Sequence, residues 1–221
     1  MQSSSDSAGP GWPRVILASR SPQRRELLRL LVPADSIEIV PPRDASEAGF
    51  DQLHELPAIE RRIAEIARAK ADDVAVQVNS RPTNGAVPIL IAADTVIVAA
   101  DWAGCLQVLG QPPADDTWQE TVRHWFREYY AGRTHAVISA LCVRQGDRQF
   151  ESLVRSEVTF SPDLDRRLDW YLATDEPRGK AGGYAIQGLG SLLVTNISGS
   201  LSNVIGLPLE ALRDILEPLA G

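Results

Sequence analysis

Arginines are concentrated at the start of an expected helix near the N-terminus. Residues 15–31 are predicted to form a strand, a tight loop and a helix that begins at Pro22. Arg20, Arg24 and Arg25 fall at the helix start, where unpaired backbone N–H groups already present partial positive charge. A bound polyanion such as a phosphate chain explains three cations there most simply. A solvated basic turn is the alternative that spacing leaves open.

A single acidic residue interrupts the most apolar stretch of the chain. Residues 87–100 are expected to form a buried central strand, and Asp94 lies within it. A buried ionised carboxylate without partners is costly, so Asp94 should be paired, protonated or bound to a metal. Such a carboxylate is a candidate functional residue. Alternatively, the strand ends at Ala93 and Asp94 caps a turn.

Two further segments carry side chains suited to ligand binding. In the helix expected over residues 57–74, Lys70 lies on the apolar stripe, either as a ligand contact or as a lysine whose stem covers apolar surface. The glycine-rich residues 179–190 include Lys180 and Gln187. This segment either clamps a ligand through close backbone approach or forms a set of tight turns.

The remaining pattern predicts an α/β fold with a mixed sheet. Apolar runs at 37–40, 134–143 and 149–160 predict strands, and the turn at 145–148 makes the last two an antiparallel hairpin. Helices are expected over residues 115–131 and 162–174 and from Pro208 onward. In the first of these helices the predicted buried side consists of Trp118, Val122, Trp125 and Tyr129.

Bulk properties narrow the class of partner. The chain has 221 residues and a net charge of −7, which argues against broad nucleic-acid binding and favours a small phosphate-bearing molecule in a local basic pocket. No apolar run reaches the ~20 residues that cross a bilayer. Two unspaced cysteines and a start without a secretory pattern predict a cytoplasmic location. Residues 1–12 are expected to form a disordered tail, and residues 13–221 a single domain.

Several chemistries are excluded by missing motifs. The chain has no P-loop, no complete dinucleotide fingerprint, no zinc-type Cys/His spacing and no arrangement that suggests a Ser-His-Asp triad. Carboxylate and cation chemistry remains. Asp94, helped by Glu47 and a divalent ion, could activate water beside a phosphate chain. The residues therefore predict metal-assisted hydrolysis of a phosphoanhydride.

Six segments in register resemble the Maf family of nucleoside triphosphate pyrophosphatases. The resemblance extends from about Val15 to Leu216, and the segments are 17–28 (LASRSPQRRELL), 93–96 (ADTV), 132–135 (GRTH), 175–177 with 180–182 (DEP and KAG), 184–188 (YAIQG) and 203–208 (NVIGLP). It implies an α/β fold with a mixed, partly antiparallel sheet, flanking helices and two lobes around a central cleft, related to the ITP pyrophosphatases. It also implies cleavage between the α and β phosphates with Mg²⁺ or Mn²⁺, and is compatible with a homodimer.

The same resemblance suggests roles for individual residues. Asp94 matches the catalytic carboxylate that accepts a proton from the attacking water. Ser19 and Arg24 match the phosphate-binding loop, and Lys70 matches a basic ligand contact. Metal coordination would fall to Asp94 and Glu47, because the other member of the family's acidic pair is replaced by Ser46.

Two further positions depart from the family pattern, and one of them bears on base specificity. A lysine is usual where Gln111 stands. Family members that act on dTTP and UTP typically carry Arg, Thr and Gln where this chain has Gln23, Thr95 and Gln187. Two of these three residues agree with the pyrimidine branch, and an amide such as that of Gln187 can read a pyrimidine edge. The resemblance therefore favours dTTP/UTP.

A second function class is also open. The family has been linked to septum formation and cell-division arrest, which would suit a nucleotide-binding regulator without catalysis. Retention of Asp94 favours the enzyme, because binding a triphosphate alone gains nothing from an additional carboxylate. Gln111 in place of lysine argues mildly for the regulator.

Overall fold

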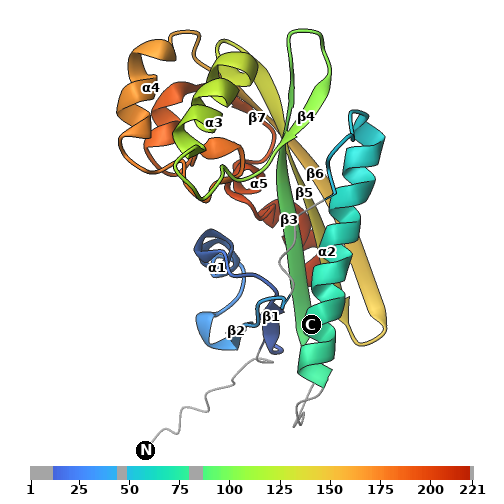
Figure 1. Cartoon of the computed structure of the whole chain (residues 1–221). Coiled ribbons are helices and arrows are strands. Elements are labelled where there is room, and N and C mark those ends of the chain that lie inside the picture. Colours follow the sequence, from blue (N-terminus) through green and yellow to red (C-terminus); the bar gives the residue numbers. More distant parts are fainter. Residues whose placement is uncertain (1–11, 44–48, 80–86, 220–221) are drawn as a thin grey trace, which may run out of the picture.

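A twisted mixed sheet forms the centre of the protein in the computed structural model, which describes residues 12–43, 49–79 and 87–219 (Figure 1). The strands are β1 (Val15–Leu17), β2 (Ile37–Ile39), β3 (Ile89–Ala100), β4 (Leu106–Leu109), β5 (Thr134–Gln145), β6 (Arg148–Phe160) and β7 (Val194–Ser198). The helices are α1 (Pro22–Leu28), α2 (Leu56–Asn79), α3 (Trp118–Trp125), α4 (Asp165–Leu172), α5 (Leu201–Ile205) and α6 (Leu209–Leu216). β1, β2 and part of β3 pair in parallel, and the other pairs are antiparallel.

The long strand β3 is open in the middle of one edge. β5 pairs with one edge of β3 from Leu90 to Val98. On the other edge β1 pairs with Ile89–Ile91 and β4 pairs with Ile97–Ala100. Residues 92–96 therefore have no strand partner on this edge among the described residues. The chain leaves the sheet on both sides of this gap, after β1 and after β4.

Alternation along β3 divides the core into three clusters. Leu90, Ala92 and Val96 point to the face covered by α2, whose apolar stripe packs there. On the opposite face Ile91 belongs to a cluster with α1 and α6, whereas Ile97 belongs to a cluster with α3 and α4. The opposite face thus carries two separate lobes, one at each end of β3 (Figure 1). The predicted mixed sheet and the two-lobed α/β architecture are confirmed.

Several elements differ from the sequence expectations. α2 continues to Asn79, five residues beyond the predicted end at 74. The strands β4 and β7 and the helix α5 were not predicted. Asp94 pairs with Ala140 inside β3, so the alternative in which the strand ends at Ala93 is wrong.

The aromatic helix also buries a different side from the one expected. Trp118 and Val122 are buried as predicted, but after α3 the chain continues as a π-helix, η2 (Phe126–Tyr130). The wider turn shifts the periodicity by one residue. Phe126 and Tyr130 are fully buried, whereas Trp125 and Tyr129 are only partly buried.

Two further expectations concern the N-terminal tail and membrane-spanning segments. Residues 1–11 of the expected tail lie outside the described residues, and Trp12 is half-buried against the cluster that contains α1 and α6. Among the described residues, no helix is both long enough and apolar enough to span a membrane.

A buried amide fixes α5 to the sheet and gives a stability prediction. The fully buried Asn203 donates from Nδ2 to the Val137 carbonyl and to Ser156 Oγ, both at 3.0 Å. Asn203→Ala should lower the free energy of unfolding by about 2 kcal/mol, because both acceptors lose their donor. Urea unfolding measures this, with Asn196→Ala on the exposed part of β7 as the control. Equal losses in the two variants would contradict the assignment.

Candidate functional site

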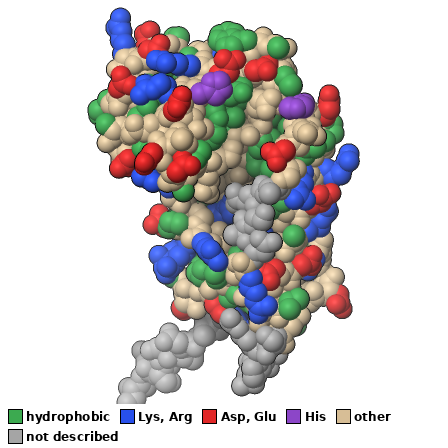
Figure 2. Space-filling view, in the orientation of Figure 1, with side chains coloured by type: hydrophobic (Ala, Val, Ile, Leu, Met, Phe, Trp, Pro, Cys, Tyr) green, Lys and Arg blue, Asp and Glu red, His purple; other side chains and the backbone are tan. Residues whose placement is uncertain are grey.

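A cavity of about 1010 Å³ lies at the open edge of β3, between the two lobes. Its walls are formed by the segments 18–24, 110–111, 179–181, 184–188 and 204–206, together with Pro42, Lys70, Thr95, Ile97 and Glu176. In Figure 2 the surface is hollowed between the lobes, and lysine or arginine atoms are visible in the hollow. A cavity of this size can hold a nucleotide. The cavity therefore lies where β3 has no strand partner.

Asp94 and Thr95 reach opposite faces of β3 at this gap. The Asp94 side chain points toward α2, where Lys70 Nζ donates to its Oδ1 at 2.6 Å. Both residues are buried, with relative exposures of 1% and 7%. The Lys70 ammonium ends at this carboxylate, and Lys70 also lines the cavity. Since buried charges occur mainly in pairs, the ion pair accounts for a lysine on the apolar stripe of α2.

Arg24 connects three segments around the cavity. Its Nη1 donates to the Ala93 carbonyl at 2.7 Å, and its Nε donates to the Gly206 carbonyl at 2.9 Å. Nη2 lies 3.2 Å from Thr95 Oγ1, and Nη1 lies 3.5 Å from Ser19 Oγ. The guanidinium thus joins α1, the open edge of β3 and the loop after α5. This residue organises the cavity wall in addition to contributing positive charge.

The loop before α1 is ordered by short-range hydrogen bonds. Ser21 is the N-cap, as predicted, and its Oγ accepts from Arg24 N at 3.3 Å. Ser21 Oγ also donates to Gln23 Oε1 at 3.1 Å, and the buried Ser19 accepts from Ser21 N at 3.1 Å. Arg20 is exposed and lines the cavity. Arg25 is exposed but does not line the cavity, so one of the three arginines expected around a polyanion lies elsewhere.

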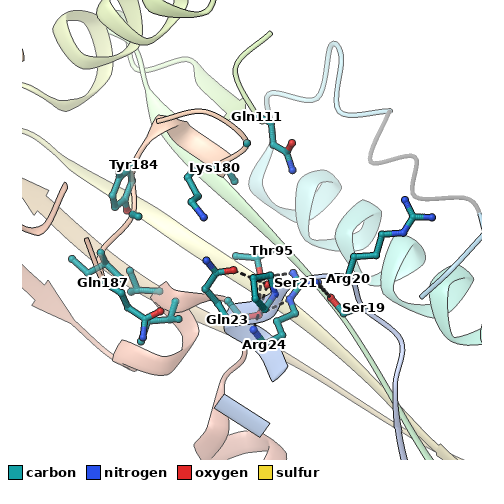
Figure 3. A pocket seen from close by; sticks show the side chains of 18 of the residues that line it. Ser19, Arg20, Ser21, Gln23, Arg24, Thr95, Gln111, Lys180, Tyr184 and Gln187 are labelled. Carbon is teal, nitrogen blue, oxygen red and sulfur yellow. Dashed lines mark hydrogen bonds between the residues drawn. The ribbon is translucent and has the colours of Figure 1, made fainter. Parts of the chain in front are cut away.

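The opposite wall carries Lys180, Gln111 and Gln187. Figure 3 shows the Lys180 side chain extending toward Ser21 and Gln23 across the cavity. Gln111 and Gln187 are exposed side chains on this wall. The cavity therefore places the predicted specificity residues Gln23 and Gln187 on facing walls.

Thr95, the third predicted specificity residue, is occupied by protein contacts. Its hydroxyl lies 2.8 Å from Ser139 Oγ and 3.3 Å from the Gly206 carbonyl, besides the Arg24 contact. These contacts fix the floor of the cavity.

Lysine usage is a signal that the sequence reasoning missed. The chain has 22 basic residues, but lysine occurs only at positions 70 and 180. Both lysines line the cavity. A compact, strongly hydrated ammonium differs from a planar guanidinium, and a chain that uses arginine everywhere else retains lysine at these two places. Lys180 therefore deserves the same weight as Lys70 among the candidate ligand contacts.

The fit of a divalent metal depends on Asp94. Glu47, the second predicted metal ligand, lies outside the described residues, and no group of three or more His, Cys, Asp or Glu side chains suited to a metal occurs in the described ranges. Mg²⁺ is commonly held by one or two carboxylates together with substrate phosphates and water. Asp94 is 1% exposed, is paired with Lys70 and is not among the residues that line the cavity. From the open edge of β3 its carboxylate could supply one donor of such a partial set.

His135 contacts Tyr184, a residue of the cavity wall, from the buried core. Its Nε2 lies 2.8 Å from the Tyr184 hydroxyl, and both rings are buried among Tyr130 and Phe160. Burial lowers the pKa of His135 to about 3, and burial raises the pKa of Tyr184. Both groups are therefore neutral near pH 7. This contact holds the first residue of the 184–188 segment.

The buried ion pair predicts a loss of stability on removal of its cation. Lys70→Met should reduce the free energy of unfolding by about 3 kcal/mol, because a buried carboxylate loses the ammonium beside it. Chemical denaturation measures the change. Lys180→Met, at the other lysine of the chain, serves as the matched control and should cost less than about 1 kcal/mol. Similar losses in both variants would show that pairing with Asp94 is not the cause.

The buried histidine predicts a pH dependence of stability. Because the folded-state pKa of His135 is about 3 and its ordinary value is 6.5, only the unfolded chain binds a proton between these values. The contribution is fully present above pH 6.5 and decreases by about 1.4 kcal/mol per unit as the pH falls toward 3. His135→Phe should flatten the slope between pH 6 and pH 5, whereas exposed His124→Gln should not. An unchanged slope in His135→Phe would contradict this assignment.

Comparison with known proteins identifies the family. The family described as "Maf-like protein" matches residues 14–219. A dTTP/UTP pyrophosphatase of Alcanivorax borkumensis is 40% identical over 209 residues, covering 92% of this chain and 94% of that protein. The dTTP/UTP pyrophosphatases of Pyrococcus furiosus and of Anaeromyxobacter dehalogenans strain 2CP-1 are 35% and 37% identical, each over 92% of this chain and over 94% and 93% of their own lengths. The chain therefore belongs to the Maf family.

Proposed function

We propose that this protein is a nucleoside triphosphate pyrophosphatase acting on dTTP and UTP. The observation that carries the proposal is the Asp94–Lys70 pair at the open edge of β3, beside a cavity whose walls contribute Arg20, Arg24 and Lys180. A triphosphate needs several cations, and a hydrolytic water needs a proton acceptor. The similarity to relatives named dTTP/UTP pyrophosphatase supports the same activity and the same bases.

In the proposed reaction, water attacks the α-phosphorus and the bond between this phosphorus and the α–β bridging oxygen breaks. The nucleoside monophosphate and pyrophosphate leave, and the Asp94 carboxylate accepts the proton of the water. The ammonium of Lys70 beside it would favour the ionised form of Asp94 that this role requires. Lys180 and Arg20, on the cavity wall, would contact the phosphate chain and balance its charge. Arg24 would hold the loop that contains Ser19 beside β3.

The proposal includes a divalent ion, Mg²⁺ or Mn²⁺. Asp94 and phosphate oxygens would hold it, and when bound it would neutralise charge that develops on the phosphates. We also propose a cytoplasmic location. The free thiols of Cys105 and Cys142 support it, because structural disulfides are typical of oxidising compartments.

Base selection would depend on the two facing amides. Gln187 offers a donor and an acceptor to the ring carbonyls and N3–H of thymine or uracil. Gln23 lies on the opposite wall, where its Oε1 is held by Ser21. Gln187 is thus the stronger candidate for reading the base.

Pyrophosphate release from a panel of dTTP, UTP, CTP, dATP and GTP tests the activity. With Mg²⁺ or Mn²⁺, the native protein should favour dTTP and UTP. Asp94→Asn should lower kcat by about 10³-fold while nucleotide binding persists, because the amide cannot accept the proton of the water whereas the basic residues of the cavity wall remain. Asp163→Asn, the same change at an exposed carboxylate, should leave kcat unchanged.

Two results would overturn this proposal. Full activity in Asp94→Asn would remove this carboxylate from the reaction. Native protein that binds nucleotides without releasing pyrophosphate would instead favour the regulator.

A further inference from the structure

The Glu176 carboxylate is surrounded by donors from two elements. Tyr171, on α4, donates its hydroxyl to Oε1 at 3.1 Å. The backbone N–H groups of Gly190 and Leu189 donate to Oε1 and Oε2, both at 2.8 Å. Glu176 also lines the cavity. Three donors on two oxygens explain how an acidic side chain is accommodated in a cavity proposed to bind a polyanion.

The loop that wraps this carboxylate requires glycine. A Cβ atom at Gly188 would lie 2.2 Å from Glu176 Oε2 and 2.6 Å from its Cδ. A Cβ atom at Gly190 would lie 2.9 Å from both Tyr171 Oη and the Ala185 carbonyl oxygen. The backbone therefore approaches the carboxylate more closely than any other residue type would allow without displacement. Glu176 and these two glycines form one packed unit.

Gln187 immediately precedes this unit. Among the described residues its side chain has no hydrogen-bond partner, and it is exposed at the cavity wall (Figure 3). The position of its Cα atom, from which the side chain projects, consequently depends on the adjoining backbone. That backbone is held by Glu176 at residues 189 and 190 and by the Gly188 N–H, which donates to the Ala185 carbonyl at 3.2 Å.

We propose that Glu176 is a positioning residue that orients Gln187 for recognition of the pyrimidine base. This inference rests on the proposed function, and it adds a specificity-determining residue outside the three that the sequence indicated. The carboxylate form matters because it presents acceptors only. A glutamine at this position would direct an N–H₂ group at one of the three donors.

Base discrimination, measured in the native protein and in Glu176→Gln, tests the proposal. The ratio of kcat/KM for UTP to that for CTP should fall about fivefold, the effect of one misdirected hydrogen bond. The KM for UTP should rise more than kcat falls. Inhibition by inorganic tripolyphosphate, which probes only the phosphate contacts, should stay within about twofold of the native value. Glu120→Gln, at an exposed position on α3, is the matched control.

Gly188→Ala tests the same contact from the loop side. Its added methyl group should displace the Glu176 carboxylate. The ratio of kcat/KM for UTP to that for CTP should therefore fall, as in Glu176→Gln. In a Glu176→Ala background the same glycine change should have little additional effect, because the two residues act as one unit. The glycine variant therefore carries the test where Glu176→Gln does not fold.

The outcomes separate the two proposals. Native protein that hydrolyses no nucleotide would overturn the proposed function. Active native protein with an unchanged base ratio in folded Glu176→Gln or Gly188→Ala would overturn only the positioning role. A parallel loss of tripolyphosphate inhibition would assign Glu176 to general stability of the cavity and would also overturn that role.

Discussion

The open stretch in one edge of β3 is the constraint on which the site depends. A strand this long is paired by β1 at one end and β4 at the other, and neither partner reaches residues 92–96. Because side chains alternate along a strand, this short interval presents Asp94 to one face and Thr95 to the other. Backbone at such a gap needs other partners. Arg24 supplies one of them through the Ala93 carbonyl.

The cavity follows from the same gap. The two connections that leave the sheet beside it, after β1 and after β4, become facing walls, and segments from the C-terminal half of the chain close the remaining sides. The Arg24 guanidinium holds three of these segments together. Its contacts to Gly206 and Thr95 make it part of the frame as well as a source of charge. Arg24 therefore has a structural role in the cavity wall that does not depend on a ligand.

The acidic side chains at the cavity are paired with donors, whereas two basic residues on its wall are not paired among the described residues. The Asp94 carboxylate is paired with Lys70 behind the wall, and Glu176 is occupied by three donors. Arg20 and Lys180 remain on the wall with no side-chain partner in the part of the chain that the structure describes. Although the protein as a whole carries a net charge of −7, lysine or arginine atoms are visible in the hollow between the lobes (Figure 2). The net charge of the chain therefore does not describe the charge at the cavity.

The sequence by itself determined what depends on neighbouring residues and on periodicity. The Ser21 cap, the apolar stripe of α2 with Lys70 on it, the β5–β6 hairpin and the buried carboxylate of Asp94 all follow from spacing and the cost of burying polar groups. Six sequence motifs in register were sufficient to predict the family. The sequence did not predict the extra residue per turn at η2, because packing of Phe126 and Tyr130 decides it.

Only the tertiary structure decided which side chains meet. The pairing of Lys70 with Asp94, the three-way contact of Arg24 and the placement of Gln23 opposite Gln187 join residues 24 to 182 positions apart in the chain. The role of Glu176 was not predicted, although the residue lies in the 175–177 motif, because its partners are a tyrosine five residues earlier and backbone N–H groups 13 and 14 residues later, which leave no periodic signal. Local preferences specify helices and strands, but the pairing of β3 with two different strands along one edge is a long-range event, and it places the site.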